Sequence, residues 1–510
     1  MQDGKNITEI KTGDQKIIEN KELNIWEALI PVFALIAMLA YNVFIYGDDA
    51  LGGSNQFILL LGGAVAAIVG FKNKVSYKRM MEEVAENIKS TAGAILILLM
   101  VGSLAGTWLI SGIIPSMIYY GLQILNPTIF LVACLIISAV ISIATGSSWT
   151  TSATVGIALI GIGDALGISL GMTAGAVLSG AYFGDKMSPM SDTTNLAPAM
   201  AGTDLFTHIR YMTYTTIPTF MVTMIFFIIL GFTQTATGEA DTQGMLADID
   251  KAFNITPWLF LVPVFVIVLI TKKTPPLIAL LGGTLLGGVF ALIFQPDVVA
   301  QIAGVKSLDF KSAYKGVMQA ITVETSVATD NEVLKDLFTA GGMKKMLGTV
   351  WLILLAMVFG GIMDAIGALA RISSFMLGLF DSVFGLFAST VATCIGLNFT
   401  ASDQYLAIVV PGKMYAKAYR DKGLAPENLS RTLEDSGTVT SVLIPWNTCG
   451  AYHSGVLGVP VVDYAFFAMF NWLSPFMTLL FAAFRIKIRE LAKPSKEGSK
   501  KQHKSSKIVR

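Results

Sequence analysis

The stretch GDKMSPMSDTTN at residues 184–195 puts two carboxylates, one ammonium group and four hydroxyls directly after an apolar helical pattern. A second polar stretch, GSSWTTS at residues 146–152, interrupts an earlier apolar run and carries five hydroxyls. Such groups are costly in lipid and are tolerated mainly where they line a cavity or an ion path. The two stretches therefore predict helices that break inside a membrane around a polar site.

The composition supports a membrane setting for these polar stretches. The chain has 510 residues, of which 54% are hydrophobic and 14% are charged, and its mean hydropathy is +0.65. A soluble domain carries roughly 25% charged residues. Apolar runs such as 129–143 and 351–361 reach the roughly 20 residues of a spanning helix once their flanks are included. We therefore expect an all-α, polytopic helical membrane protein.

Several other classes of protein find no support in the sequence. The net charge of +1 and the absence of a basic face argue against a nucleic-acid partner. The three cysteines show no paired spacing, so neither a disulfide framework nor a zinc site is indicated. No catalytic or phosphate-binding motif is present, which disfavours an enzyme, and no cofactor is expected.

An internal repeat is visible in the apolar sequence. LLGG occurs at 60–63 and again at 280–283, and LILLM at 96–100 returns as LILLAM at 352–357. We therefore divide the chain into five parts. These are an N-terminal segment at 1–24, a first repeat at 25–232, a loop at 233–255, a second repeat at 256–484 and a basic tail at 485–510.

The distribution of charge predicts the orientation of these parts. The loop at 72–89 is rich in Lys and Arg, which is typical of the cytoplasmic side, whereas the loop at 233–255 is acidic and fits the outside. Lys272 and Lys273 then place the next turn inside. Corresponding loops thus lie on opposite faces, which predicts inverted repeats with both termini cytoplasmic. We expect a multi-pass protein of the cell (inner) membrane in contact with the lipid bilayer.

Each repeat carries its own polar cluster after an equivalent apolar run. In the second repeat the cluster begins near Asn398 and Asp403 and continues at Asp435, and we match Asp403 with Thr151 or Ser152 of the first repeat. Two alternatives remain open. The small residues at 144–156 could mediate close helix packing, and the charged residues at 184–195 and at 434–435 could lie in ordinary solvated cytoplasmic loops.

The residue types indicate cation exchange. Asp185 and Asp192 lie seven positions apart, and Pro189 between them favours a broken segment over an intact helix. Sodium prefers oxygen ligands, which Asp, Ser, Thr and Asn supply. Desolvation favours the protonated form of a carboxyl group, so one aspartate can hold a proton and a cation in turn. Lys186 either neutralises one aspartate or attracts an anionic substrate.

Taken with GSSWTT at 146–151 and IPWNTCGA at 444–451, the string at 180–195 resembles the NhaC family of sodium/proton antiporters. The resemblance covers nearly the whole chain except its tails. It implies an ion-transporter fold with a scaffold domain and a transport domain that contains broken helices and re-entrant hairpins. It also implies two kinds of activity, because some relatives exchange sodium for protons and others exchange malate plus protons for sodium and lactate.

We therefore predict a secondary transporter that exchanges Na⁺ for H⁺ through carboxylates within the membrane. The alternatives are sodium-linked exchange or uptake of an organic anion or amino acid, and an ion channel. A homodimer is an open expectation. The predicted ion- or substrate-binding residues are Ser147, Thr150, Thr151, Asp185, Lys186, Ser188, Asp192, Thr193, Asn195, Asn398, Thr400, Asp403, Asp435, Thr438, Asn447 and Thr448, with Asp185, Asp192 and Asp403 as sodium ligands.

Overall fold

Apolar runs in this chain fold into helices because a backbone in hydrocarbon must satisfy its own hydrogen bonds. The computed structural model describes residues 7–12, 15–20, 23–46, 52–233, 242–329, 332–378 and 382–491. Within these ranges eight helices are long and apolar enough to cross a membrane, or nine if the bent pair at 243–271 forms one span. The predicted polytopic helical membrane protein is confirmed. Parts of the predicted N-terminal segment, the 233–255 loop and the tail lie outside the described residues, namely 1–6, 13–14, 21–22, 234–241 and 492–510.

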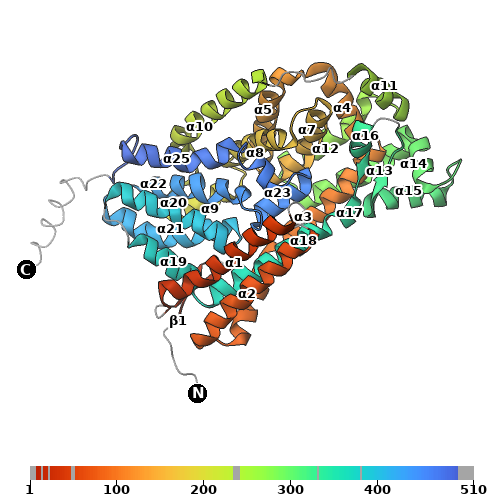
Figure 1. Ribbon diagram of the computed structural model, residues 1–510. Coiled ribbons are helices and arrows are strands. Elements are labelled where there is room, and N and C mark those ends of the chain that lie inside the picture. Colours follow the sequence, from red (N-terminus) through yellow and green to blue (C-terminus); the bar gives the residue numbers. More distant parts are fainter. Residues whose placement is uncertain are drawn as a thin grey trace, which may run out of the picture.

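The first half of the chain contains the elements up to α10 (Figure 1). The helices are α1 (Ile25–Tyr46), α2 (Ser54–Lys72), α3 (Tyr77–Ile110), α4 (Ile113–Ile124), α5 (Pro127–Thr145), α6 (Ser148–Thr151), the π-helical turn η2 (Ser152–Gly156), α7 (Ile157–Ala165), α8 (Leu170–Met187), α9 (Asp192–Ala201) and α10 (Leu205–Thr233). The strands β1 (Ile7–Thr12) and β2 (Gln15–Asn20) precede them as an antiparallel hairpin that the all-α expectation did not include.

The second half begins after the 233–255 loop. Its helices are α11 (Thr242–Ala252), η3 (Pro257–Phe260), α12 (Leu261–Thr271), α13 (Pro276–Phe294), α14 (Pro296–Ala303), α15 (Phe310–Thr322), α16 (Glu332–Leu337), α17 (Gly342–Lys345), α18 (Leu347–Ala365), α19 (Ala368–Leu377), α20 (Val383–Thr400), α21 (Gln404–Asp421), α22 (Pro426–Leu433), the π-helical turn η4 (Glu434–Thr438), η5 (Ser441–Leu443), α23 (Thr448–Leu457), α24 (Val461–Tyr464) and α25 (Met469–Ala483). The short strands β3 (Thr325–Ser326) and β4 (Thr339–Ala340) pair with each other.

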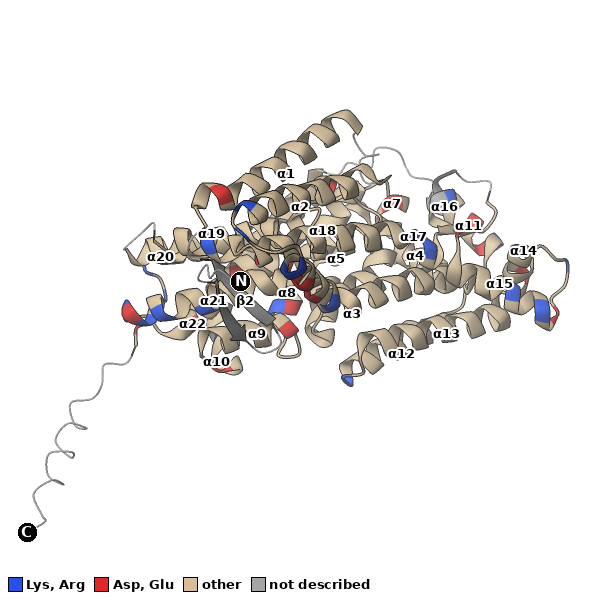
Figure 2. Cartoon of the chain, turned by 90° about the horizontal axis from the view of Figure 1, so that it is seen from below, with Lys and Arg blue, Asp and Glu red and all other residues tan. Residues whose placement is uncertain are grey.

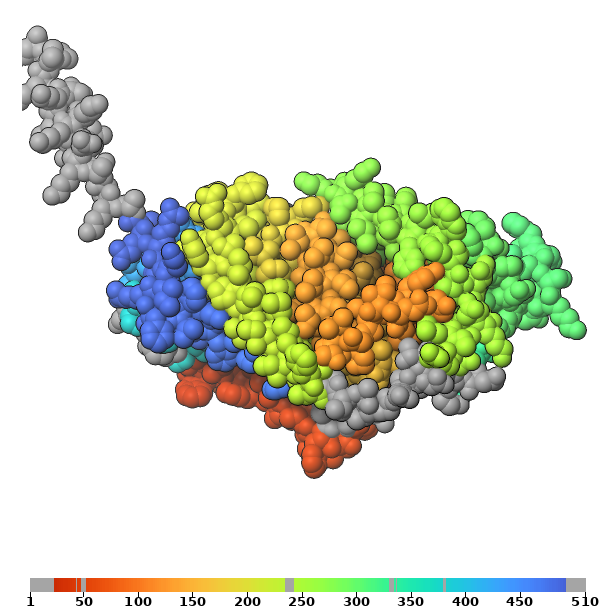
Figure 3. All heavy atoms as spheres, turned by 90° about the horizontal axis from the view of Figure 1, so that it is seen from above, coloured from red at the N-terminus to blue at the C-terminus, as the bar shows by residue number. Residues whose placement is uncertain are grey.

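The two halves interleave in space. Helix α3 packs against both α13 and α18, and α10 lies between α5 and α25, as the yellow-green strip in Figure 3 shows. Helices α14 and α15 stand at one end of the molecule and α19 to α22 at the other (Figure 1). Charged residues are sparse along the helices and gather mainly near their ends (Figure 2), as expected where the helix surface faces lipid.

A constant spacing of left-handed backbone positions marks the repeat. Four residues with positive φ in the first half recur 255 or 256 positions later, each at a break between helices. The pairs are Gly112 with Gly367, Gly146 with Ser402, Gly167 with Gly423, and Gly202 with Gly458. The same spacing separates LILLM from LILLAM. This register pairs Asp403 with Ser147, so our sequence match of Asp403 to Thr151 or Ser152 was wrong.

The spacing between equivalent positions of the two repeats is different before α3 and α18. The two LLGG motifs lie in α2 and α13 and are only 220 positions apart. The difference arises because α2 and α3 are joined by a short turn, whereas α14 to α17 lie between α13 and α18. The second half therefore carries an inserted helical segment that the first half lacks.

The beginning of the basic tail is attached to the helices. The backbone N–H of Ala425 donates to the carbonyl of Arg489 at 2.9 Å, and the N–H of Leu491 donates to the carbonyl of Gly423 at 2.8 Å. The Arg489 guanidinium also pairs with Glu427 of α22 at 2.7 Å. These contacts attach the tail to the turn between α21 and α22.

Candidate functional site

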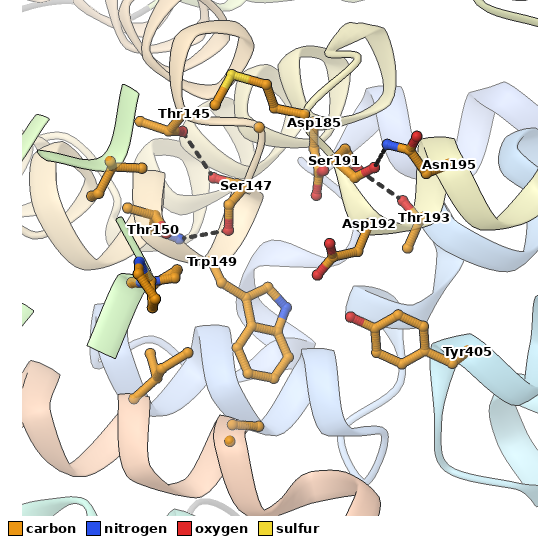
Figure 4. Close-up of a pocket in the computed structure, with 18 of the residues that line it drawn as sticks. Thr145, Ser147, Trp149, Thr150, Asp185, Ser191, Asp192, Thr193, Asn195 and Tyr405 are labelled. Carbon is orange, nitrogen blue, oxygen red and sulfur yellow. Dashed lines mark hydrogen bonds between the residues drawn. The ribbon is translucent and has the colours of Figure 1, made fainter. Parts of the chain in front are cut away.

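A cavity of about 670 Å³ lies where the broken helices of both repeats meet. Its walls come from the middle of α3, the α5–α6 and α8–α9 breaks, the α12–α13 turn, and the first residues of α21 and α23. Figure 4 shows the carboxylate of Asp192 and the hydroxyl of Tyr405 pointing into the space beside the Trp149 ring. The cavity is thus polar on one side and aromatic on the other.

The first break is built by one glycine and one cap. Gly146 ends α5 with φ of 69°, and a Cβ atom there would overlap Met190 and the backbone of Ser191. The hydroxyl oxygen of Ser147 then accepts the N–H of Thr150 at 3.2 Å and starts a new helix. The break turns the new helical N-terminus toward the cavity.

Asp185 is held against that N-terminus. One of its carboxylate oxygens accepts the N–H of Ser148 at 3.1 Å and the Ser148 hydroxyl at 2.7 Å. Its side chain is buried yet lines the cavity, with 8% of its surface exposed. Two hydrogen bonds at a helix N-terminus stabilise the charged form, which opposes the cost of desolvation.

Close packing of α5 and α8 fixes the position of Asp185. A Cβ atom on Gly180 would overlap the carbonyl of Leu135, and one on Gly184 would overlap the chain at Ala139 and Ser142. The hydroxyl of Ser142 donates to the carbonyl of Ala181 at 2.5 Å. Close packing through small residues, which the sequence suggested for 144–156, thus occurs at these two glycines of α8 beside the polar site.

The second repeat builds a matching break. Ser402 has φ of 59°, and Asp403 caps α21 by accepting the N–H of Leu406 at 3.0 Å. The N–H of Thr448 donates to the carbonyl of Ser402 at 2.9 Å, which joins this break to the start of α23. Asn398 donates to the carbonyl of Gly437 at 2.7 Å, the repeat counterpart of the bond from Ser142 to Ala181.

The second break in the first repeat follows the prediction. Helix α8 ends at Met187 and α9 begins at Asp192, with Pro189 between them. Ser191 caps α9 by accepting the N–H of Thr194 at 3.4 Å. Asp192 is exposed at the first turn of α9, whereas Asp185 is buried, so the two carboxylates lie in different environments.

The part of the chain that contains most of this site matches a known protein family. The family model of the "Na+/H+ antiporter family" matches residues 180–486, which contain two of the three breaks described above. The chain belongs to this antiporter family. It is 38% identical to the Na(+)/H(+) antiporter NhaC of Alkalihalophilus pseudofirmus over 82% of this chain and 87% of that protein.

Two further relatives come from Bacillus subtilis. The Na(+)/H(+) antiporter NhaC of that organism is 37% identical over 79% of this chain and 86% of its own length. The malate-2H(+)/Na(+)-lactate antiporter is 36% identical over 88% of this chain and 92% of its own length. The family thus includes relatives named for different cargoes.

In this antiporter family member, half of the predicted site residues line the cavity. They come from both repeats, as the prediction required. They are Ser147, Thr150, Asp185, Asp192, Thr193, Asn195, Asp403 and Thr448.

The other eight predicted residues do not line the cavity. Most serve the breaks themselves. Thr151 donates to the carbonyl of Ser147, Ser188 to that of Ile143, and Thr400 to that of Gly396. Asn447 caps α23 and donates to Asn398, while Thr438 is buried in η4. The remaining residues of this group are Lys186 and Asp435.

Lys186 and Asp435 form a buried ion pair that joins the two repeats. Both side chains are 0% exposed, and Asp435 also accepts hydroxyls from Thr215, at 2.8 Å, and from Thr478. Of the two roles considered for Lys186, neither neutralising Asp185 or Asp192 nor holding an anion in the cavity matches this arrangement. The ammonium group of Lys186 in α8 is therefore paired within the protein, where it joins the two repeats.

The three proposed sodium ligands do not converge on one point. Among the described residues, no group of three His, Cys, Asp or Glu side chains is close enough to hold a metal ion together. A sodium ion at Asp185 would therefore rely on neutral oxygens for its other ligands.

Sequence reasoning missed many cavity residues, and two of them carry titratable side chains that bear on the site. Tyr405 follows Asp403 in α21, and Lys273 comes from the α12–α13 turn. The position of Tyr405 beside a capping aspartate could have drawn attention to it. Nothing in the local sequence of Lys273 connects it with residues of α8 or α9, since only the packing of distant helices brings them together.

Proposed function

We propose that this chain is a sodium/proton antiporter that exchanges Na⁺ for H⁺ at Asp185. The observation that carries the proposal is a buried carboxylate in the wall of a hydroxyl-rich cavity, hydrogen-bonded to Ser148 at the start of a broken helix. Membership of the Na+/H+ antiporter family supports the same activity. No bound cofactor is required, because the carboxylate performs the exchange itself.

The chemistry at Asp185 is competition between two cations for one carboxylate. The oxygen that accepts from Ser148 stays engaged, and the other oxygen takes either a proton or a sodium ion. The oxygens of Ser147, Thr150 and Thr193 supply neutral ligands of the kind that sodium prefers. Because one group holds only one cation at a time, loading sodium on one side requires releasing the proton there.

The charges around the cavity favour a cation as cargo. Asp185, Asp192 and Asp403 face one lysine, Lys273, in the cavity wall. Lys186, the residue that would hold an organic carboxylate, is paired with Asp435. The similarity to the malate/lactate antiporter makes organic-anion exchange the second candidate, with Lys273 as its anion-binding group.

The charge bias also supports an orientation. Lys273 lines the cavity, and it belongs to a turn whose basic character is typical of the cytoplasmic side. We therefore infer that this conformation opens toward the cytoplasm, with the chain in the cell membrane and both termini inside.

Reconstituted proteoliposomes with a pH dye inside test the proposal. External sodium is expected to drive proton efflux from the vesicles, and Asp185→Asn is expected to abolish it, because an amide can bind sodium but cannot exchange a proton at neutral pH. The rate should be bell-shaped in pH, since the proton must be both released and reloaded. Asp204→Asn makes the same change at an exposed α10 cap outside the cavity and should leave exchange intact.

The cargo is decided in the same vesicles. Lithium, malate, lactate and amino acids replace sodium in turn. Proton movement that requires malate or lactate on one side would establish the second candidate instead. Normal sodium-driven proton movement in folded Asp185→Asn would remove Asp185 from the exchange site.

A further inference from the structure

An aromatic contact between the two repeats lies next to the proposed exchange site. The ring of Trp149, which follows Ser148 in α6, stacks on the ring of Tyr452 in α23, with centroids 3.9 Å apart and planes at 18°. The Tyr452 hydroxyl donates to the backbone carbonyl of Trp149 at 3.2 Å. Trp149 lines the cavity (Figure 4), whereas Tyr452 is 0% exposed and does not line it. Tyr452 therefore supports the cavity wall without touching the cargo.

Two further contacts continue this interface along the helices. His453 of α23 and Ser152, the first residue of η2, share a hydrogen bond of 2.9 Å between Nδ1 and Oγ, and both are fully buried. A Cβ atom on Gly156, the last residue of η2, would lie 3.0 Å from a side chain in the last turn of α23. We call the Trp149–Tyr452 and Ser152–His453 contacts the α6–α23 clamp.

Helix α6 needs contacts of this kind to keep its orientation. It has only four residues, Ser148–Thr151, before η2 interrupts the α-helical pattern. Helix ends fray where tertiary contacts do not hold them. The two donors to Asp185, at 3.1 and 2.7 Å, are the N–H and the hydroxyl of Ser148, the first residue of this helix. Because Trp149 is the next residue, its stack on Tyr452 restricts where these donors lie.

Helix α23 is anchored independently of α6. Asn447 caps it by accepting the N–H of Cys449 at 3.0 Å, and the N–H of Thr448 donates to the carbonyl of Ser402 at 2.9 Å. Tyr452 is thus presented to the first repeat by a helix that is fixed to the break of the second repeat. The donors to a first-repeat carboxylate therefore depend on the second repeat for their position.

The clamp has no equivalent at the matching break of the second repeat. At the repeat spacing of 256 positions, Trp149 corresponds to Tyr405, and Tyr452 corresponds to Leu196. A leucine cannot stack as a ring does, and among the described residues no ring contact involves Tyr405. The break with the stack is the one that donates to Asp185, whereas the matching break carries an aspartate that caps its own helix. This asymmetry favours a role at the exchange site over general packing.

We propose that Tyr452 is a positioning residue of the exchange site, which holds Ser148 against Asp185 through the ring of Trp149. The inference rests on the proposed sodium/proton exchange, and it adds that a residue of the second repeat outside the cavity sets the affinity for sodium. A carboxylate that is held in one orientation before its cation arrives binds that cation more tightly than a mobile one, because it has less freedom to lose.

Proteoliposomes with a pH dye inside test this role across a series of external sodium concentrations. Tyr452→Leu is expected to raise the sodium concentration for half-maximal exchange by about tenfold, the effect of losing one hydrogen bond to a charged group, and to leave the maximal rate within about twofold. Tyr452→Phe keeps the ring stack and should stay near the wild type. Tyr464→Leu is the matched control, because it removes another fully buried tyrosine whose hydroxyl donates to a backbone carbonyl, that of Val442 at 2.8 Å. It should leave the half-maximal sodium concentration unchanged.

A second measurement reads Asp185 without requiring transport. Infrared difference spectra between each protein and its Asp185→Asn version isolate the carboxylate bands of this residue in alkaline, sodium-free buffer. These bands are expected to shift in Tyr452→Leu, because Ser148 no longer donates, and to keep their positions in Tyr452→Phe and Tyr464→Leu. If the wild type exchanges no sodium for protons, the proposed function fails, and these spectra still decide whether Tyr452 holds the contact.

The inference would be overturned by carboxylate bands and a half-maximal sodium concentration that stay unchanged in folded Tyr452→Leu. It would also be overturned if Tyr464→Leu produced the same changes, or if Tyr452→Phe behaved like Tyr452→Leu. Tyr452→Met, whose flexible side chain adapts to irregular gaps, replaces Tyr452→Leu if that variant does not fold.

Discussion

Asp185 and Lys186 are neighbours in the chain, yet their side chains serve different parts of the molecule. Successive residues of a helix point about 100° apart. Asp185 therefore reaches the cavity and the Ser148 cap, while Lys186 reaches Asp435 of the other repeat. One turn of α8 thus combines the proposed exchange site with the contact that joins the repeats.

The exposed carboxylate of Asp192 is expected to assist binding without exchanging the proton. Because it is exposed to the cavity, water screens its charge. Asp192→Asn should keep sodium-driven proton movement and raise the sodium concentration for half-maximal rate by roughly threefold, an electrostatic effect of screened charges. Rates across a sodium series measure this. Complete loss of exchange in folded protein would instead make Asp192 an exchanging group.

The Lys186–Asp435 pair should matter for stability because both partners are fully buried. Removing one partner of a buried ion pair typically costs about 3–5 kcal/mol, whereas replacing both by apolar residues is often neutral. Lys186→Met and Asp435→Leu are therefore each expected to lower the unfolding temperature in detergent. The double variant should recover much of the loss, and thermal unfolding followed by Trp fluorescence checks it. Equal unfolding temperatures in all four proteins would contradict this role.

At the scale of elements, the breaks between helices were predictable and their partners were not. Gly146, Pro189 and the runs of hydroxyls interrupt apolar sequence, and local sequence carries that signal. The pairing of Lys186 with Asp435 joins residues 249 positions apart and depends on helix packing, which no local pattern encodes. The same reason explains why Lys273 was missed.

The register between the repeats was misjudged for a related physical reason. Hydroxyls are abundant in both clusters, so matching by residue type allows several alignments. Backbone conformation is more discriminating, because a positive φ is rare outside glycine. Ser402 has a positive φ at the position equivalent to Gly146 of the first repeat. This pairing makes Asp403 the equivalent of Ser147.

The contact between α5 and α8 offers a test at the element scale. A Cβ atom at Gly180 would overlap the backbone carbonyl of Leu135, which cannot move aside as a side chain can. Gly180→Ala is expected to destabilise the protein by about 1–3 kcal/mol, as overpacking does. Gly396→Ala is the matched control, since nothing lies within 4 Å of its Cβ position. Comparable unfolding temperatures for both variants would contradict the tight contact.

At the scale of the whole molecule, the two halves share the cavity and interleave around α3 and α10. The constant spacing of the helix breaks favours the predicted repeat, and the charge bias predicts that it is inverted. The inserted helices α14 to α17 are an asymmetry that accounts for the different spacings of the two repeated motifs, 220 positions for LLGG and 256 for LILLM.

Cysteine labelling in intact cells tests the orientation. The native cysteines Cys134, Cys394 and Cys449 are buried, so background labelling should be low. A cysteine placed at exposed Asp250 is expected to react with an impermeant reagent from outside, and one at exposed Lys78 only after permeabilisation. The reverse pattern, or equal labelling at both positions, would contradict the inverted arrangement.

The distance in sequence between Lys186 and Asp435 also has a consequence for biogenesis. A ribosome adds about 5–20 residues per second, so Asp435 is synthesised on the order of tens of seconds after Lys186. During that interval the nascent first repeat holds an ammonium group in the bilayer without its acid, a costly state that the insertion machinery must tolerate. The first repeat therefore completes its fold only when translation of the second is nearly finished. If the two halves were made as separate polypeptides, neither would complete its fold until it associated with the other.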